Sequence, residues 1–272
     1  MTTFIILGAT GDLSKRKLFP AIAKLVEDKK IKKFAVVGVS RSRTTITSIL
    51  KQSKKFSKSS KWQEITKRSS YLTMNFYQKE DYINLGEHLK EVEKKHSLVG
   101  NRLFYLATMP QHFDTTTSNL ATSKLTKTKG WSRVVYEKPF GHNLKSAKKI
   151  NSCINRVFNE KNVYRIDHYL GKELVGNISL MRFTNRVLEP LWNRHHVRAV
   201  DIIMKEKIDV GTRGSYYDKY GALKDVVQNH ALQLLALTAM EAPKSLTGND
   251  VRNQKAKVLQ KTTVKKAFLG QY

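Results

Sequence analysis

The fold is decided near the start of the chain, where residues 4–13 read FIILGATGDL. Phe4 to Leu7 form a short apolar run that ends at a glycine, as a buried parallel strand followed by a turn does. Apolar residues then recur at helical spacing, at Leu18, Ala21, Ile22 and Leu25. A strand, a glycine turn and a helix together indicate a phosphate-binding start, because helix N-terminal amides face an anion and glycines let a pyrophosphate approach.

This turn supplies the first candidate cofactor-binding residues, which are Gly8, Thr10, Gly11, Asp12 and Leu13. Its glycines do not have the full G-x-G-x-x-G spacing of dinucleotide-binding turns. An ordinary structural turn is therefore the alternative.

The second predicted strand, Phe34 to Val39, decides the cofactor at its end, where residues 40–43 read SRSR. A site for NAD is expected to carry an Asp or Glu here, which accepts hydrogen bonds from ribose hydroxyls. No carboxylate is nearby, and arginines suit the 2′-phosphate of NADP through bidentate, charge-assisted hydrogen bonds. We predict NADP with Arg41 as its reader; solvated arginines in a basic chain are the alternative.

Strand-like and helix-like segments alternate through the first half of the chain. Further strands are expected at Tyr71 to Met74, Leu103 to Ala107 and Arg133 to Tyr136. Helices are expected within residues 44–69, at Asp81 to His96, from after Gln111 to about residue 125, and at Leu144 to Phe158. This alternation predicts an α/β fold with a doubly wound parallel sheet.

The charge of the chain is extreme, at +28 over 272 residues. Such a field attracts phosphorylated small molecules and could attract nucleic acid. We do not expect nucleic acid as a partner, because the sequence has no helix-turn-helix, zinc-finger or base-stacking motif. A bias toward lysine on solvated faces is the simpler explanation.

Cys153 is the single cysteine, so neither an intrachain disulfide nor a multi-cysteine zinc site can form. The apolar run at Phe4 to Leu7 is too short for a signal peptide. No stretch approaches the ~20 apolar residues of a membrane helix. We expect a cytoplasmic protein with no membrane contact.

A second informative stretch is RIDHYLGKE at residues 165–173, which is rich in charge and contains Gly171. Asp and Gly both weaken helices, so the stretch fits a strand end that turns into a helix beginning near Lys172. Asp167, His168 and Tyr169 would then lie at an element boundary, where binding groups often sit. A solvated loop is the alternative.

The strongest helical pattern covers Ala222 to Met240 and contains His230. One face is expected to carry Leu223, Val227, His230 and Leu234. Asp225 lies five residues before His230, about 140° around an α-helix. A satisfied core histidine is the alternative.

Seven motifs stand in a fixed order along the chain. They are GATGDL (8–13), RLFYL (102–106), EKPFG (137–141), RIDHYLGKE (165–173), FTNR (183–186), WNR (192–194) and DVVQNH (225–230). In these motifs the chain resembles the glucose-6-phosphate dehydrogenase family over essentially its whole length. The resemblance implies NADP-dependent oxidation of glucose 6-phosphate at C1 to 6-phosphogluconolactone, the first step of the oxidative pentose phosphate pathway.

The resemblance also implies roles for individual residues. His230 is expected to be the catalytic base, and Asp167 is expected to orient its imidazole. Lys138, His168, Tyr169, Lys172, Glu206 and Asp225 are expected to bind the sugar phosphate. Lys138 would contact the cofactor as well. The resemblance also implies a cis peptide bond between Lys138 and Pro139. No metal is required.

The predicted organisation is an NADP-binding domain at residues 1–165 and an incomplete, truncated α+β substrate domain at 166–272. The second domain is expected to hold a strand at Ala199 to Met204 and a loop at Gly211 to Tyr220. Family members continue beyond Tyr272, so a homo-oligomer or a complementing second chain could cover the strand. The alternative from another class is a shortened, non-catalytic relative that binds NADP or nucleic acid.

Overall fold

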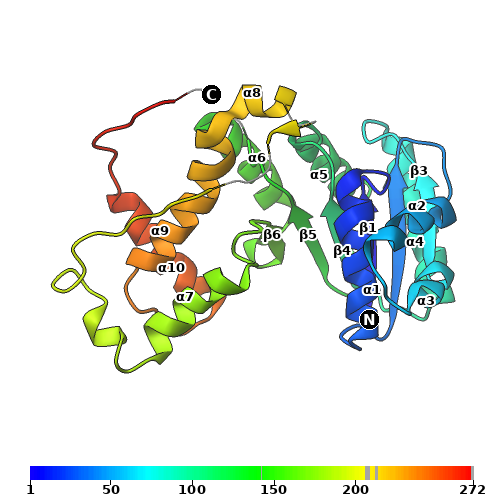
Figure 1. The fold of residues 1–272 in the computed structure, drawn as a ribbon. Coiled ribbons are helices and arrows are strands. Elements are labelled where there is room, and N and C mark those ends of the chain that lie inside the picture. Colours follow the sequence, from blue (N-terminus) through cyan, green and yellow to red (C-terminus); the bar gives the residue numbers. More distant parts are fainter. Residues whose placement is uncertain (142, 206–208, 212–213, 271–272) are drawn as a thin grey trace. The chain divides into compact units, whose positions relative to one another are not determined.

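The computed structural model describes residues 1–141, 143–205, 209–211 and 214–270. It divides into two compact units, Met1–Ile166 and Asp167–Tyr272 (Figure 1). The boundary expected between residues 165 and 166 lies one residue from this division.

The first unit is built on a six-stranded parallel sheet with the strand order β3-β2-β1-β4-β5-β6 (Figure 1). Its strands are β1 (Thr2–Leu7), β2 (Phe34–Ser40), β3 (Ser69–Thr73), β4 (Arg102–Leu106), β5 (Ser132–Tyr136) and β6 (Val163–Arg165). The strand order reverses direction between β1 and β4, and such a switch point opens a crevice beyond the carboxyl ends of the strands. The predicted doubly wound parallel sheet is confirmed.

Helices cover both faces of this sheet. They are α1 (Phe19–Glu27), α2 (Ile46–Ser53), α3 (Trp62–Lys67), α4 (Lys79–Lys95), α5 (Phe113–Thr122) and α6 (Leu144–Val157). Ile6 of β1 packs in one buried cluster with residues of α1, α2 and α3. Ile5 and Leu7 of the same strand pack in a second cluster with residues of α4, α5 and α6. Because side chains alternate along a strand, this apolar run fills the core on both faces.

The second unit contains helices and no strand among its described residues. Its helices are α7 (Glu173–Thr184), the 3₁₀ helix η5 (Glu189–Leu191), α8 (Gly214–Ala222), the π-helix η7 (Leu223–Ala231), α9 (Leu232–Ala239) and α10 (Gly248–Lys261). Val175, Leu237 and Met240 form its buried apolar cluster. The guanidinium of Arg182 donates hydrogen bonds to the carbonyls of Leu237 and Met240, at 2.7 and 2.8 Å. This caps the end of α9 and joins it to α7.

Two expectations for the second unit are wrong. Ala199 to Met204 form no strand, and Ile203 is 76% exposed. An apolar, extended segment becomes a strand only when another strand pairs with its backbone, and no strand occurs among the described residues after Ile166. The expected loop at Gly211 to Tyr220 is helical from Gly214 onward, where α8 begins.

The predicted helix at Ala222 to Met240 is confirmed, but its first half is a π-helix rather than an α-helix. As a result the expected apolar face is wrong at its start, since Leu223 is 61% and Val227 is 43% exposed. Hydrogen bonds from i to i+5 widen the turn, so residues five apart share a face. Asp225 and His230 are accordingly both buried.

None of the helices in the described parts of the chain has the length and apolarity needed to cross a membrane.

Candidate active site

The first unit contains a pocket of about 430 Å³ beyond the carboxyl ends of β1, β2, β4 and β5. Its lining includes the expected residues Gly8, Thr10, Gly11, Leu13, Arg41 and Lys138. It also includes residues that the sequence had not singled out as binding residues: Ser40, Ser42, Phe76, Ala107, Thr108, Met109, His112 and Glu137. Most of these follow directly after strands, and that position was the available signal.

Gly8 is a position in the turn where no other residue type fits. Its φ is +99°, and a Cβ atom added to it would lie 2.3 Å from the carbonyl oxygen of Ala107. The Gly8 amide donates to the Val39 carbonyl at 2.8 Å, and the hydroxyl of Ser14 donates to the Gly8 carbonyl at 2.9 Å. The turn is thus fixed between the ends of β2 and β4, and its bare backbone fits the close approach of a pyrophosphate.

Asp12 does not line this pocket. Its carboxylate is exposed and lies 3.6 Å from the guanidinium of Arg16, one helical turn along. The remaining predicted residues of the turn line the pocket, so Asp12 is the member that the structure sets apart.

The end of β2 is held beside the glycine turn by hydroxyl groups. The Ser40 hydroxyl lies 3.0 Å from that of Thr10 and 2.7 Å from that of Tyr71. Arg41 and Ser42 follow and line the pocket. Glu137 is the one carboxylate in the described lining, and it stands at the end of β5 rather than of β2. A cation with hydroxyls at the end of β2 fits a 2′-phosphate better than ribose hydroxyls alone.

His112 lies in the 3₁₀ turn Pro110–His112 that follows β4. It is buried, and its Nδ1 lies 2.8 Å from the hydroxyl of Tyr77. Burial lowers the pKa of His112, and the nearby positive charge of Arg41 lowers that pKa further. Both effects favour the neutral form of this histidine.

Glu137 and Lys138 come from the end of β5. The hydroxyl of Tyr105 donates a short hydrogen bond to the Glu137 carboxylate. Burial raises the pKa of Tyr105, and this bond to Glu137 raises it further. The Lys138–Pro139 peptide bond is cis, as the resemblance implied.

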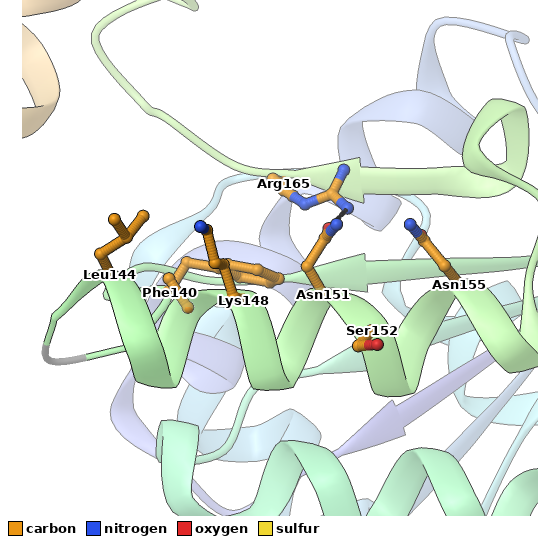
Figure 2. Close-up of a pocket in the computed structure, with 8 residues that line it drawn as sticks. Phe140, Leu144, Lys148, Asn151, Ser152, Asn155 and Arg165 are labelled. Atoms are coloured by element: carbon orange, nitrogen blue, oxygen red, sulfur yellow. Dashed lines mark hydrogen bonds between the residues drawn. The ribbon is translucent and has the colours of Figure 1, made fainter.

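A second pocket of the first unit lies between α6 and β6 (Figure 2). Arg165 at its edge donates hydrogen bonds to Glu160 at 2.7 Å and to Asn151 at 2.6 Å. Its guanidinium also stands 5.1 Å from the centre of the Phe140 ring. These contacts fix the last residue of β6, and the RIDHYLGKE stretch begins there.

The second unit contains a paired carboxylate and imidazole. Nδ1 of His230 lies 2.6 Å from Oδ1 of Asp167, and His230 is 2% exposed. A carboxylate accepts from an N–H, so this contact places a ring proton on Nδ1 of His230. A carboxylate that pairs with an imidazole in this way orients the ring, as in catalytic triads.

Aromatic and basic residues of the same stretch surround the imidazole. The Tyr169 ring stacks on the His230 ring, with centroids 4.0 Å apart and an angle of 16° between the planes. The His168 ring meets the His230 ring edge-on at 4.5 Å. The ammonium of Lys172 lies 3.5 Å from the centre of the Tyr169 ring, and both His168 and Lys172 are exposed. The structure thus gathers three expected phosphate-binding residues around the expected base.

The other expected substrate residues are placed differently. Asp225 is buried on the same π-helix as His230. Lys138 belongs to the pocket of the first unit. Glu206 lies outside the described residues.

Lys255 of α10 was not among the residues expected from the sequence. Its ammonium donates to the Gln233 side chain at 2.7 Å, one turn beyond His230. Burial lowers the pKa of Lys255, whereas the charge of Asp167 acts in the opposite direction. The charge of Asp167 therefore acts on Lys255.

Asp167, His168 and His230 also bring possible metal-ligand atoms within 4.8 Å of one another. The 2.6 Å contact between Asp167 and His230 engages two of these atoms with each other.

Comparisons with known proteins agree along the whole chain. Residues 5–177 match the family model "Glucose-6-phosphate dehydrogenase, NAD binding domain", and residues 179–272 match "Glucose-6-phosphate dehydrogenase, C-terminal domain". A glucose-6-phosphate 1-dehydrogenase from Bacillus subtilis is 42% identical over 94% of this chain and 53% of its own length. Its counterpart from Chlamydia pneumoniae is 41% identical over 94% and 53%.

Solved structures give the same result. A glucose-6-phosphate dehydrogenase in complex with glucose-6-phosphate superposes with a TM-score of 0.89 at 37% identity, over 95% of this chain and 55% of that one. The enzyme from Mycobacterium avium gives a TM-score of 0.82 at 32% identity, over 95% and 56%. The chain spans about half the length of the curated relatives it matches. The matched residues and the fold show that the chain belongs to the glucose-6-phosphate dehydrogenase family.

Proposed function

We propose that this chain carries out the NADP-dependent oxidation of glucose 6-phosphate at C1 to 6-phosphogluconolactone. The observation that carries the proposal is the bond between Asp167 and His230, which orients the imidazole for the role of a base. Relatives with the name of this enzyme support the substrate class.

In this reaction Nε2 of His230 takes the proton of the C1 hydroxyl. The C–H bonding pair leaves C1 as a hydride while the hydroxyl oxygen forms the carbonyl of the lactone. NADP, when bound, supplies the acceptor for that hydride. The imidazole becomes positively charged in this step, and the Asp167 carboxylate stabilises this charge as a carboxylate does in a catalytic triad.

Binding of the sugar phosphate is assigned to the residues around His230. Lys172 and His168 are exposed and basic, so they can donate to the phosphate, and Tyr169 can donate through its hydroxyl. Glu206 and Asp225 are proposed to accept hydrogen bonds from the sugar hydroxyls. Lys138 is proposed to contact both cofactor and substrate.

The cofactor is assigned to the pocket of the first unit. Gly8 and Gly11 give a pyrophosphate access to the backbone, and Arg41 with Ser42 faces the 2′-phosphate. Thr10 and Leu13 line the same pocket, and Asp12 remains a proposed ligand only through its place in the turn.

The proposal is tested by following the absorbance of reduced nicotinamide with glucose 6-phosphate and either NADP or NAD. We expect turnover with NADP that requires the sugar phosphate. Tight, salt-sensitive binding to nucleic acid with no turnover would instead support a non-catalytic relative. A measurement of the size of the active species would show whether it is the proposed homo-oligomer or a complex with a second chain. A cytoplasmic location is proposed with the same function.

A further inference from the structure

His112 is a titratable group in the cofactor pocket to which no role has been assigned. It is 7% exposed, and it lines the pocket together with Arg41 and Ser42. Most buried histidines only fill space. His112 differs because it lines the pocket proposed for a phosphorylated cofactor, together with the cation expected to bind the 2′-phosphate.

The groups that interact with His112 come from the segments after β2 and β3. Tyr77, which follows β3, bonds to Nδ1 at 2.8 Å, and the Phe76 ring centre lies 6.0 Å from the imidazole. Arg41 follows β2 and acts on the ring through its charge. The other charged groups of the described pocket lining are Glu137 and Lys138, after β5.

The bond to Tyr77 is compatible with both charge states of the ring. A phenol hydroxyl can donate to the bare Nδ1 of a neutral imidazole, and it can accept from the Nδ1–H of an imidazolium. A change of protonation therefore keeps this contact. Without a ligand, burial and Arg41 both favour the neutral ring.

A doubly negative phosphate placed in this pocket reverses the balance. It offsets the charge of Arg41 and stabilises a positive imidazole at close range. NAD lacks the 2′-phosphate, so it leaves the ring as it was.

We propose that His112 is a second 2′-phosphate-binding residue beside Arg41, and that it takes up a proton when NADP binds. The inference rests on the proposed cofactor. It assigns to this chain a pH-dependent preference for NADP over NAD, strongest in mildly acidic solution.

Calorimetric titration of the full chain tests this without any turnover. NADP is titrated at pH 7.5 in two buffers of different ionisation enthalpy, and NAD is titrated in the same way. We expect the complex to take up on the order of half a proton when NADP binds, and none when NAD binds. The 2′-phosphate itself, with a pKa of about 6, is almost fully ionised at pH 7.5 and releases little.

By linkage, half a proton corresponds to an NADP dissociation constant that rises about threefold per pH unit near pH 7.5. His112→Gln keeps a polar partner for Tyr77 but cannot titrate. We expect it to abolish the proton uptake and flatten the pH dependence for NADP, with an unchanged melting temperature to confirm its fold.

Equal proton uptake for NADP and NAD in the wild type, or unchanged uptake in His112→Gln, would overturn the inference while leaving the cofactor assignment intact. Failure of NADP to bind at all would instead remove the proposed cofactor, and the role of His112 with it.

Discussion

At the scale of single residues, the imidazole of His230 is fixed in position on three sides. Asp167 holds Nδ1 at 2.6 Å, the Tyr169 ring stacks on one face and the His168 ring meets it edge-on. These contacts set the tautomer, the plane of the ring and the direction of Nε2. Geometry of this kind is what general base catalysis requires before any tuning of the pKa.

His230→Asn removes the base but keeps a polar side chain of similar size. We expect turnover to fall by roughly 10²–10⁴-fold, the usual contribution of general acid–base catalysis. Binding of the sugar phosphate should survive. Lys172→Thr is the matched control, and it should mainly weaken substrate binding. Steady-state kinetics separate the two, and normal turnover by His230→Asn would remove the histidine from the chemistry.

Arg41→Ala tests the reader of the 2′-phosphate. Hydrogen bonds to charged groups contribute roughly 1.5–3 kcal/mol each, so NADP binding should weaken by at least about tenfold. NAD makes no such contact and should bind nearly as before. Arg43, which does not line the pocket, provides the control variant Arg43→Ala. Equal losses for both cofactors would show that Arg41 does not read the phosphate.

At the scale of secondary structure, α4 is tied to β4 by a buried ion pair. Arg102 donates to both oxygens of Glu93, at 2.7 and 2.8 Å, and to the carbonyl of Leu125 at 3.0 Å. The two side chains are only 8% and 11% exposed. Two charges withdrawn from water in this way depend on each other.

Arg102→Met would leave the Glu93 carboxylate buried without its partner. We expect the free energy of unfolding to fall by about 3–5 kcal/mol, as for other broken buried pairs. Urea denaturation measures this change. Lys149→Met removes an exposed pair with Asp114 and should be nearly neutral. A loss for Arg102→Met no larger than that of the control would contradict the account.

His88 of α4 makes stability depend on pH. Its Nε2 lies 2.7 Å from the Ser70 hydroxyl on β3, and burial lowers its pKa in the folded chain. The unfolded chain therefore binds this proton more readily, and stability rises with pH up to about 6.5, the ordinary pKa of histidine. His88→Gln should reduce that rise between pH 5 and 7 in urea titrations. An unchanged slope would show that His88 does not contribute.

The sheet was predictable because its strands have local signatures, such as the apolar run before Gly8. The helix of His230 was predictable in extent but not in type, since a π-helix differs from an α-helix in hydrogen bonding rather than in composition. The prediction of a strand at Ala199 to Met204 was wrong for a different reason, because a strand depends on a partner elsewhere in the chain. His112 and Lys255 were missed because their importance comes only from tertiary neighbours.

At the scale of the whole molecule, the chain contains two units with separate tasks. The first has the large core clusters and the proposed cofactor pocket, whereas the second has a small apolar cluster and the proposed base. The proposed activity requires both, because a hydride must pass from a sugar to a nicotinamide. The decisive test of the proposed activity is therefore hydride transfer from the sugar to the nicotinamide, and not the binding of either ligand.

The most direct measurement uses glucose 6-phosphate with deuterium at C1 and oxidised NADP. The account predicts that the wild-type chain produces reduced cofactor containing that deuterium, detected by mass spectrometry, and that His230→Asn produces almost none. It also predicts slower cofactor reduction than with the unlabelled sugar wherever hydride transfer limits the rate. Reduced cofactor without deuterium, or no reduced cofactor from the wild-type chain, would contradict the claim.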